Sequence, residues 1–245
     1  MKHNLTRSWD AYDAYLIDID GTLLHCRGPV HYHAFLDALQ FLAGRPLDLS
    51  GVTAHGNTDV GILRDALVAS GIAEELWNAR LAEACERMAG FVMARSTELD
   101  PQLLPGAIQM LQSLRDRGAV LAVATGNLES IGRIKLERGA LLEYFTVGVF
   151  SDGCEFREEV FRRGTSLVRA IIGREAAICA IGDTPADIRA ARACGIDVIA
   201  VATGVHSQAE LDREAPDLCL SSMLELIAPA SHGDAHIVPP LAQIG

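Results

Sequence analysis

Short apolar runs alternate with amphipathic segments along much of this chain. Runs of strand length end at Asp18 and lie at residues 119–124, 146–150, 177–181 and 197–202. Helical patterns separate them at residues 105–118, 130–138 and 158–172. Strands joined by helices of this length predict right-handed crossovers and a parallel sheet covered on both faces. The expected fold class is therefore α/β.

Residues 29–97 have a different character, because strand-like runs disappear and helical periodicity takes over. Apolar residues recur at helical spacing in residues 31–43 and 62–69. Residues 74–96 predict one long amphipathic helix, whose apolar stripe is formed by Leu76, Leu81, Cys85, Met88, Phe91 and Val92. This whole segment reads as a helical insert.

The expected organisation is a core domain interrupted by a cap domain. We assign residues 1–26 and 99–230 to the core, residues 27–98 to the helical cap, and residues 231–245 to a C-terminal tail. His232 and His236 offer metal ligands in that tail, but a loosely held terminus is the expectation there, and no function is assigned to it.

Composition narrows the choice of partners. Nearly half of the 245 residues are apolar (49%) and the formal net charge is −11, which argues against a nucleic-acid backbone or an anionic membrane surface as a general partner. The six cysteines form no CxxC pair, the N-terminus has no signal-type apolar stretch, and no apolar run approaches the roughly 20 residues that span a bilayer. The expected location is the cytoplasm.

Polar groups follow three of the predicted strands. Asp18 and Asp20 end the first, Thr125 the second and Asp183 a later one. Because parallel strands share one carboxyl edge, these groups are expected to converge. Two carboxylates in one partly buried pocket repel each other, so the pair raises one pKa or recruits a cation. A divalent metal is the natural answer.

The motifs themselves resemble those of the haloacid dehalogenase superfamily, in its phosphoglycolate-phosphatase-like branch. Residues 18–22 read DIDGT, residues 125–127 read TGN, and residues 182–188 read GDTPADI, similar to motifs I, II and IV. The resemblance runs from about residue 14 to residue 202. It implies a Rossmann-like three-layer α/β/α fold with an inserted helical cap, and a magnesium-dependent phosphatase that acts on a small phosphorylated metabolite.

The resemblance also implies roles for single residues. Asp18 would be the nucleophile that forms an aspartyl-phosphate, and Asp20 the general acid and base. Thr125, Gly126 and Asn127 would hold the phosphoryl oxygens at a helix N-terminus. Asp18, the Asp20 backbone carbonyl and Asp183 would bind Mg²⁺, with Asp187 supporting the site indirectly or only favouring a helix start.

Two candidate residues lie in the cap and one in the segment that leads into it. Residues 56–59 (GNTD) resemble a GxTD element of such caps, so Thr58 or Asp59 either closes the cap and selects the leaving group or simply caps a helix. Arg27 follows motif I and either contacts a second anionic group of the substrate or lies on a solvated linker. Both readings stay open.

Motif III usually supplies a lysine, and here the sequence departs from the pattern. Its only lysines are Lys2, near the N-terminus, and Lys135, inside the helix after motif II. Arg157 occupies the expected place, between a strand end and a helix start, and resembles a branch with arginine there. We expect Arg157→Ala to lose most activity, Arg157→Lys to recover part of it, and Lys135→Ala to be milder.

Several other functions are compatible with parts of this pattern. A haloacid dehalogenase and a phosphonatase lack the second aspartate of DxD, so Asp20 counts against both. A phosphomutase shares the core and differs in how the cap excludes water. A non-catalytic phospho-aspartate switch or metabolite-binding module is the alternative from a different class, and the cap and Asp20 speak against it. The sequence identifies neither the substrate nor the oligomeric state.

Overall fold

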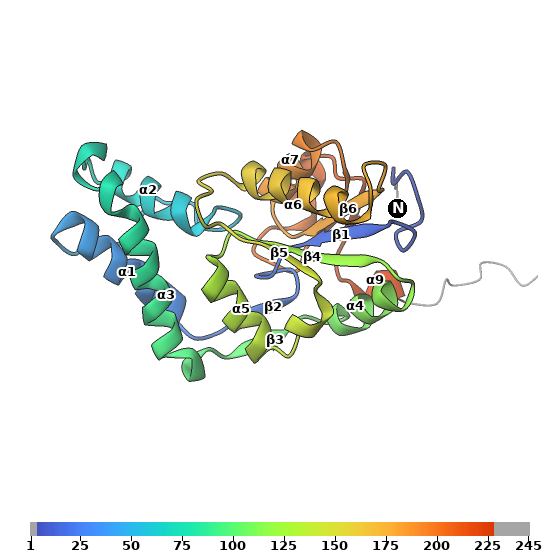
Figure 1. Cartoon of the computed structure of the whole chain (residues 1–245), viewed down its shortest axis with the longest axis horizontal. Helices are drawn as coiled ribbons and strands as arrows, with labels where there is room; N and C mark the ends of the chain where they lie inside the picture. The colour runs from blue at the N-terminus through green and yellow to red at the C-terminus, as the bar shows by residue number, and fades with distance from the viewer. Residues whose placement is uncertain (1–3, 228–245) are drawn as a thin grey trace, which may run out of the picture.

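A computed structural model describes residues 4–227 of the chain. Its centre is a six-stranded parallel sheet in the order β5-β4-β1-β6-β7-β8 (Figure 1). The strands are β1 (Ala14–Ile17), β4 (Val120–Ala124), β5 (Val147–Val149), β6 (Ile178–Gly182), β7 (Asp197–Val201) and β8 (Leu218–Leu220). Since β1 pairs with both β4 and β6, the carboxyl ends of these three strands lie side by side.

Side chains of β1 alternate between two apolar clusters, as the period of a strand requires. Tyr15 and Ile17 pack in one cluster and Ala14 and Leu16 in the other. The first cluster is covered by α4 (Ala107–Asp116), α5 (Glu129–Arg138) and α9 (Leu224–Ile227), and the second by α6 (Arg157–Ile172), α7 (Pro185–Ala193) and α8 (Gln208–Arg213). Helices therefore lie on both sides of the sheet (Figure 1), and the predicted three-layer α/β fold is confirmed.

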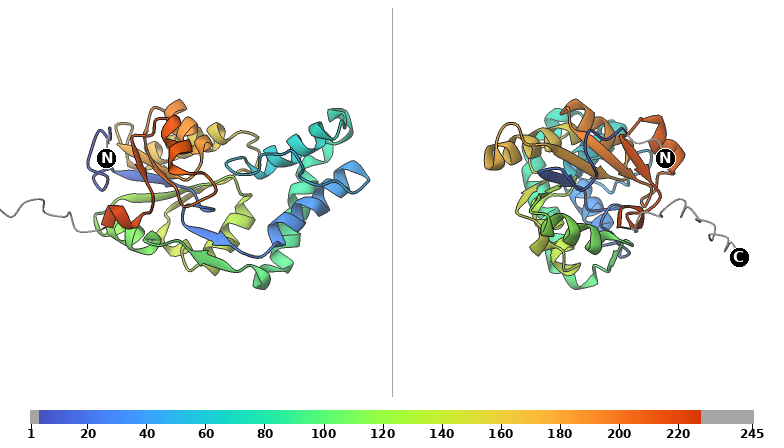
Figure 2. Two further views of the ribbon diagram at one scale, coloured as in Figure 1. Left: turned by 180° about the vertical axis from the view of Figure 1, so that it is seen from behind. Right: turned by 90° about the vertical axis from the view of Figure 1, so that its right-hand side faces the viewer.

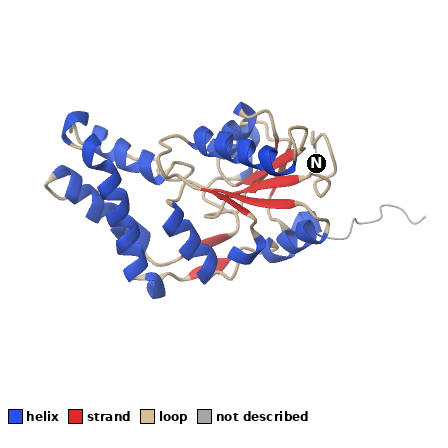
Figure 3. Cartoon of the chain, in the orientation of Figure 1, coloured by secondary structure: helices blue, strands red, loops and turns tan. Residues whose placement is uncertain are grey.

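A group of helices without a strand extends from one end of the sheet (Figure 3). It consists of α1 (Val30–Ala43), α2 (Asp59–Ala69), α3 (Leu81–Ala94) and the short turns η1 (Glu74–Leu76), η2 (Asn78–Arg80) and η3 (Ser96–Glu98). These helices share a third apolar cluster, which also takes in Leu128 and Ile131 from the start of α5. The cap therefore packs on the core at the N-terminal end of α5.

The expectation of one long helix over residues 74–96 is wrong in its first third. The chain forms two 3₁₀ turns before α3 begins at Leu81. Trp77 interrupts the helix with a φ of −126°, because its ring is buried and its Nε1–H donates to the Ile72 carbonyl at 3.3 Å. Leu76, assigned to the apolar stripe, is 67% exposed as a result.

Two short strands that the sequence analysis missed connect the cap to the core. β2 (Leu24–Cys26) and β3 (Pro101–Leu103) pair antiparallel and lie side by side in Figure 2. The chain therefore leaves and re-enters the core through one narrow ladder. Residues 228–230, predicted as the end of the core, and the predicted tail with His232 and His236 lie outside the described residues. No helix between residues 4 and 227 is long and apolar enough to cross a membrane.

Candidate active site

The first part of the site is the turn that follows β1. Asp18 is 6% exposed, and its backbone N–H donates to the Ile181 carbonyl of β6 at 3.0 Å. Gly21 adopts a φ of +81°, and a Cβ there would lie 2.3 Å from the Asp183 carboxylate. Only glycine meets both demands without strain, so this turn brings the end of β1 against the end of β6.

Asp183 comes directly after β6 and is held by a residue of that turn. Thr22 Oγ1 donates to its carboxylate at 2.9 Å. Burial, reinforced by Asp18 and Asp187, raises the pKa of Asp183 to about 8. Burial also raises the pKa of Asp18 to about 6, although the Arg157 guanidinium opposes the shift. Asp18 and Asp183 without a metal therefore resist full ionisation. The sequence predicted such a repelling pair in Asp18 and Asp20, whereas the structure shows the raised pKa values at Asp18 and Asp183 and a lowered one at Asp20.

Arg157 is the first residue of α6 and is almost fully buried. Its Nη2 lies 2.8 Å from Asp18 Oδ1 and 2.6 Å from Asp187 Oδ1, and its Nε donates to Asp187 at 2.9 Å. Burial alone would lower the pKa of the guanidinium, but the two carboxylates raise it above its usual value. Nη1 lies close to Gly126, 3.2 Å from the position of an added Cβ, and so faces the loop after β4.

Asp187 is fully buried, and both of its oxygens are already engaged. Arg157 occupies Oδ1, while the backbone N–H and hydroxyl of Thr184 donate to Oδ2 at 3.1 and 2.7 Å. Thr184 is the N-cap of α7, so Asp187 also completes a capping box there. Its carboxylate orients Arg157 and starts a helix, which combines the two sequence readings of this residue.

The acidic groups suit a hard divalent cation. Oxygens of Asp18, Asp183 and Asp187 lie within 4.8 Å of one another, and residues 4–227 contain no second such group of three acidic, histidine or cysteine side chains. Since Asp187 is committed to Arg157 and Thr184, Asp18 and Asp183 are the side chains that offer oxygens. Buried carboxylates with raised pKa values fit Mg²⁺, which prefers oxygen ligands and supplies positive charge.

The loop after β4 forms the opposite side of the site. Thr125 is buried, and Asn127 Nδ2 donates to its hydroxyl at 2.8 Å and to Asp20 Oδ2 at 2.7 Å. Gly126 has no room for a side chain, because a Cβ would lie 2.2 Å from the Asn57 carbonyl of the cap. This loop leads directly into α5, so it brings backbone N–H groups and a helix N-terminus to the site.

Lys135 is a site residue that the sequence analysis placed outside the motif III position. It lies in α5, is 3% exposed, and its Nζ donates to Asp20 Oδ2 and to Asn127 Oδ1, both at 2.7 Å. A signal was present in the sequence, since Lys135 lies four residues after Ile131 and therefore on the buried face of α5. A lysine on such a face needs an anionic partner.

Asp20 is held as an anion by these neighbours. Burial alone would raise its pKa, but the Lys135 ammonium and the Asn127 amide keep the pKa below its usual value. The two aspartates of DxD therefore differ in environment, because Arg157 binds Asp18 while Lys135 and Asn127 bind Asp20. Each carboxylate has its own cation.

The cap touches this site through the residues of the GNTD segment. Thr58 is the N-cap of α2, accepting from Gly61, and its hydroxyl donates to the Glu155 carbonyl at 2.8 Å. Asp59 donates its backbone N–H to the Gly126 carbonyl at 2.7 Å and accepts from the Leu128 N–H at 2.8 Å. The segment therefore starts a helix and also fastens the cap to the loop after β4.

His31 of α1 joins the two domains at a second point. Its Nδ1 lies 3.2 Å from Lys135 Nζ and its Nε2 lies 3.3 Å from Asp59 Oδ1. The ring stacks on Phe35, with centroids 4.9 Å apart. Because Lys135 is a donor, this contact requires Nδ1 to be the acceptor nitrogen of the ring. His31 belongs to none of the sequence motifs described above and was not predicted as a site residue.

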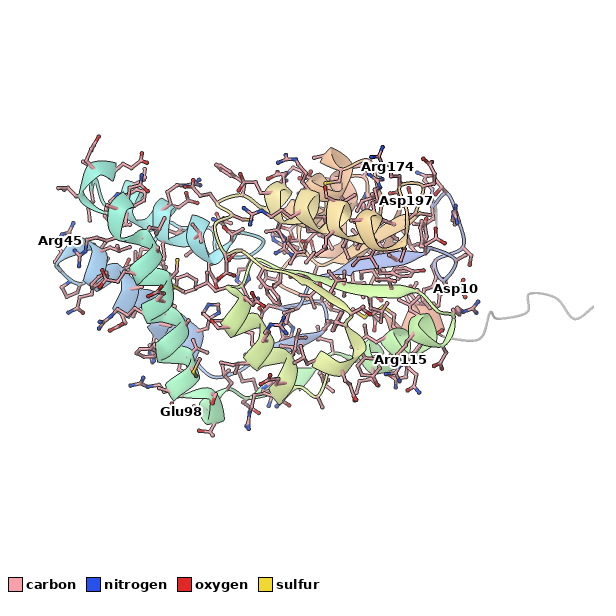
Figure 4. All side chains as sticks on the ribbon, viewed as in Figure 1. Asp10, Arg45, Glu98, Arg115, Arg174 and Asp197 are labelled. Carbon is pink, nitrogen blue, oxygen red and sulfur yellow. The ribbon has the colours of Figure 1, made fainter. Side chains whose placement is uncertain are left out.

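Most of these groups line a cavity of about 300 Å³ between the core and the cap, although the predicted Thr58 and Asp187 do not. It holds the predicted Asp18, Asp20, Thr125, Gly126, Asn127, Asp59, Arg157 and Asp183, and also Lys135 and His31. Arg27 is exposed and does not line it. A larger cavity of about 630 Å³ contains Asp10 and Arg174, which lie at the end of the sheet away from the cap (Figure 4) and carry none of the motifs.

Curated relatives resemble the chain over much of its length. It is 25% identical over 217 residues to the probable phosphatase IndB of Dickeya dadantii, covering 88% of this chain and 92% of that protein. It is 30% identical over 127 residues to the phosphoglycolate phosphatase of Synechococcus elongatus, covering 51% and 58%. These are similarities of sequence to proteins of those names.

Solved structures and family models agree with the motifs. The phosphate complex of CbbY from Rhodobacter sphaeroides shares the fold with a TM-score of 0.65 at 20% identity, covering 88% of this chain and 96% of that one. A model described as HAD-hydrolase-like matches residues 165–226. The model for haloacid dehalogenase-like hydrolases matches residues 12–195, which include all three strand-end motifs. The resemblance seen in the sequence is confirmed, and the chain belongs to the haloacid dehalogenase-like hydrolase family.

Proposed function

We propose that this protein is a Mg²⁺-dependent phosphatase that hydrolyses small phosphate monoesters through an aspartyl-phosphate on Asp18. The observation that carries the proposal is the separate pairing of the two motif I carboxylates. Asp18 lies beside Arg157 and Asp183, while Lys135 and Asn127 fix Asp20. A nucleophile and an acid-base group on one turn, each with its own cation, suit phosphoryl transfer, where positioning and charge stabilisation dominate.

In the first step, Asp18 attacks phosphorus and the bond to the leaving oxygen breaks. Arg157 is bound to Asp18 through Nη2, and its Nη1 faces Gly126, so it can bridge the nucleophile and a phosphoryl oxygen held by the Gly126–Asn127 loop. Bound Mg²⁺, held by Asp18 and Asp183, would supply the charge that lets an anion approach a phosphate dianion.

Asp20 supplies the proton to the leaving oxygen. In the free protein Lys135 keeps it ionised, but a phosphate dianion beside it raises the pKa of a carboxyl group. In the second step the Asp20 carboxylate takes a proton from water, the water oxygen bonds to phosphorus, and the bond to Asp18 breaks. Lys135 and Asn127 keep Asp20 in one position for both steps.

Asp20 also favours a phosphatase over a haloacid dehalogenase. A dehalogenase needs the nucleophile but no acid for the leaving group, whereas here Asp20 has a dedicated lysine and amide. The curated relatives named as phosphatases support the same choice.

Phosphate release from a panel of monoesters, with Mg²⁺ or with a chelator, tests the proposal. The panel includes p-nitrophenyl phosphate as a general substrate, and 2-phosphoglycolate because of the named relatives. Hydrolysis that requires Mg²⁺ and disappears in Asp18→Asn supports the proposal. Turnover that survives exhaustive chelation, or wild-type rates in purified Asp18→Asn, contradicts it.

A further inference from the structure

The cavity has two walls of different origin. The core wall consists of the strand-end groups, chiefly Asp18, Asp20, Asp183, Lys135 and Arg157. The cap wall consists of cap residues that face them, chiefly His31, Tyr32, Phe35, His55, Asp59 and Ile62. Since the phosphoryl group must reach Asp18 on the core wall, the rest of the substrate meets the cap wall.

The lysine and the arginine that line this cavity are already paired with carboxylates of the core wall. Arg157 binds Asp18 and Asp187, and Lys135 binds Asp20 and Asn127. Both therefore serve the reacting end, where the phosphoryl group adds two further negative charges. Neither remains for a second anionic group at the far end of a substrate.

The cap wall offers no replacement. Within residues 4–227, no lysine or arginine of the cap lines the cavity; its carboxylate is Asp59, and its imidazoles are those of His55 and of His31, whose Nε2 lies 3.3 Å from Asp59 Oδ1. Arg27 is exposed outside it, and Arg64 is paired with Asp65 and Glu155. A carboxylate on the leaving group would thus meet the Asp59 carboxylate with no lysine or arginine of the cap wall beside it, and a like-charge contact is one way in which binding sites reject a ligand.

The cap wall instead offers apolar and aromatic surface. Tyr32 keeps 46% of its surface exposed. Phe35, which stacks on the His31 ring, and Ile62 also line the cavity, although they keep only 5% and 4% of their surface exposed. Apolar lining with a few polar groups is typical of sites for neutral small molecules. This lining suits an alcohol that presents C–H groups to the cap wall.

Building on the proposed phosphatase function, we infer that the substrate is the monophosphate of an uncharged alcohol, and that the juxtaposition of Tyr32, Phe35 and Asp59 in the cap wall selects against a carboxylate in the leaving group. The protein therefore discriminates against 2-phosphoglycolate, which carries such a carboxylate, in spite of its resemblance to proteins named for that substrate.

A matched pair of esters tests the inference. 2-Hydroxyethyl phosphate and 2-phosphoglycolate have similar size and differ in a hydroxymethyl against a carboxylate group. With Mg²⁺ at about pH 8, where monoesters are dianions, we expect kcat/KM for the neutral ester to be at least about tenfold higher. Equal values, or a preference for 2-phosphoglycolate, would overturn the inference.

A pair of variants at one position gives the second arm. Tyr32 is half exposed, so Tyr32→Arg is expected to fold and would place a cation in the cap wall; Tyr32→Met is the neutral control. Relative to that control, Tyr32→Arg should shift the ratio of kcat/KM values toward 2-phosphoglycolate by about tenfold. An unchanged ratio contradicts the inference.

The outcomes also separate the two proposals. If p-nitrophenyl phosphate is hydrolysed and 2-phosphoglycolate is the better alkyl ester, the phosphatase stands and the inference about the leaving group fails. If the wild-type protein with Mg²⁺ releases phosphate from none of the three esters, the proposed function fails, and the inference fails with it.

Discussion

The core wall and the cap wall enclose the same cavity but differ in the interactions that hold their side chains. Every charged group of the core wall has a partner of opposite sign or a hydrogen-bond donor, so its geometry is fixed by electrostatics. The cap wall is mostly aromatic and aliphatic, and its single carboxylate fastens the cap to the core. Under the proposed function, one wall performs the reaction and the other selects the alcohol, so changes to the two walls should affect different kinetic constants.

The largest expected effect belongs to the nucleophile. Asp18→Asn replaces a carboxylate with an amide that cannot form the acyl-phosphate, and removal of a nucleophile from a covalent mechanism costs roughly 10³-fold or more in kcat. Steady-state phosphate release measures the loss. Asp13→Asn, an exposed carboxylate before β1, is the matched control and should keep the wild-type rate.

The next largest effect is expected for Arg157, the cation of the core wall that contacts Asp18. Arg157→Ala removes the group that touches Asp18 and leaves Asp18 and Asp187 unpaired, so we expect a loss of about 10²-fold or more in kcat and a destabilisation of about 3–5 kcal/mol. Arg157→Lys should recover only part of both, because an ammonium cannot reproduce the fork of donors. Thermal melting separates the lost rate from lost folding.

Lys135→Met should act through Asp20 and therefore depend on the leaving group. In the first chemical step, measured by rapid quench as release of the alcohol, we expect a loss of about 10²-fold with alkyl phosphates, which need a proton on the leaving oxygen, and a much smaller loss with p-nitrophenyl phosphate. The second step is common to both esters and should slow equally. Comparing the two substrates makes the readout specific. An equal loss in the first step with both esters would show that Lys135 serves the phosphoryl group instead, and full activity would show that it is dispensable.

A cap variant should change binding more than chemistry. Asp59→Ala removes the acceptor of the Leu128 N–H, so the cap closes less often and KM should rise by about tenfold with a smaller change in kcat. Asp59→Asn keeps an acceptor oxygen and should be milder. A fall in kcat at constant KM would mean that the cap wall takes part in the reaction. It would contradict the proposed separation of catalysis on the core wall from substrate selection on the cap wall.

The last prediction concerns stability and its dependence on pH. The ordinary pKa of an aspartate is 3.8 and that of Asp183 here is about 8, so between these values the folded state keeps a proton that the unfolded state has lost. Stability of the metal-free protein should therefore fall as pH rises from about 4 to about 8. Mg²⁺ should raise the melting temperature more at about pH 8 than at about pH 5, because protons no longer compete with it for Asp183. In Asp183→Asn this difference should shrink; an unchanged difference would place the metal elsewhere.

The core wall could be predicted from sequence because its residues follow strands directly. Asp18, Thr125 and Asp183 each come at the carboxyl end of a buried run, and a parallel sheet brings such ends together. Lys135 was underestimated because a motif argument looks for a lysine at one place in the chain, whereas the buried face of α5 delivers it from another.

The cap was harder to predict because its structure depends on contacts between distant residues. The buried ring of Trp77 stops a helix that the apolar pattern of residues 74–96 extends, and the two-stranded ladder of β2 and β3 exists only because the insert returns beside its start. Likewise Arg27 follows motif I closely in sequence, yet it does not line the cavity, whereas His31 does.

The central claim is that Asp18 carries the phosphoryl group and Asp20 releases it. Asp20→Asn lacks the base for the second step, whereas p-nitrophenyl phosphate needs no acid for the first, so this pair should accumulate the intermediate. The measurement is mass spectrometry of the acid-quenched protein after mixing with p-nitrophenyl phosphate and Mg²⁺. We predict the added mass of one phosphoryl group on the peptide that contains Asp18, present in Asp20→Asn and absent in the double variant with Asp18→Asn. A phosphoryl group on another residue, or none while p-nitrophenol is released in a burst, would contradict the account.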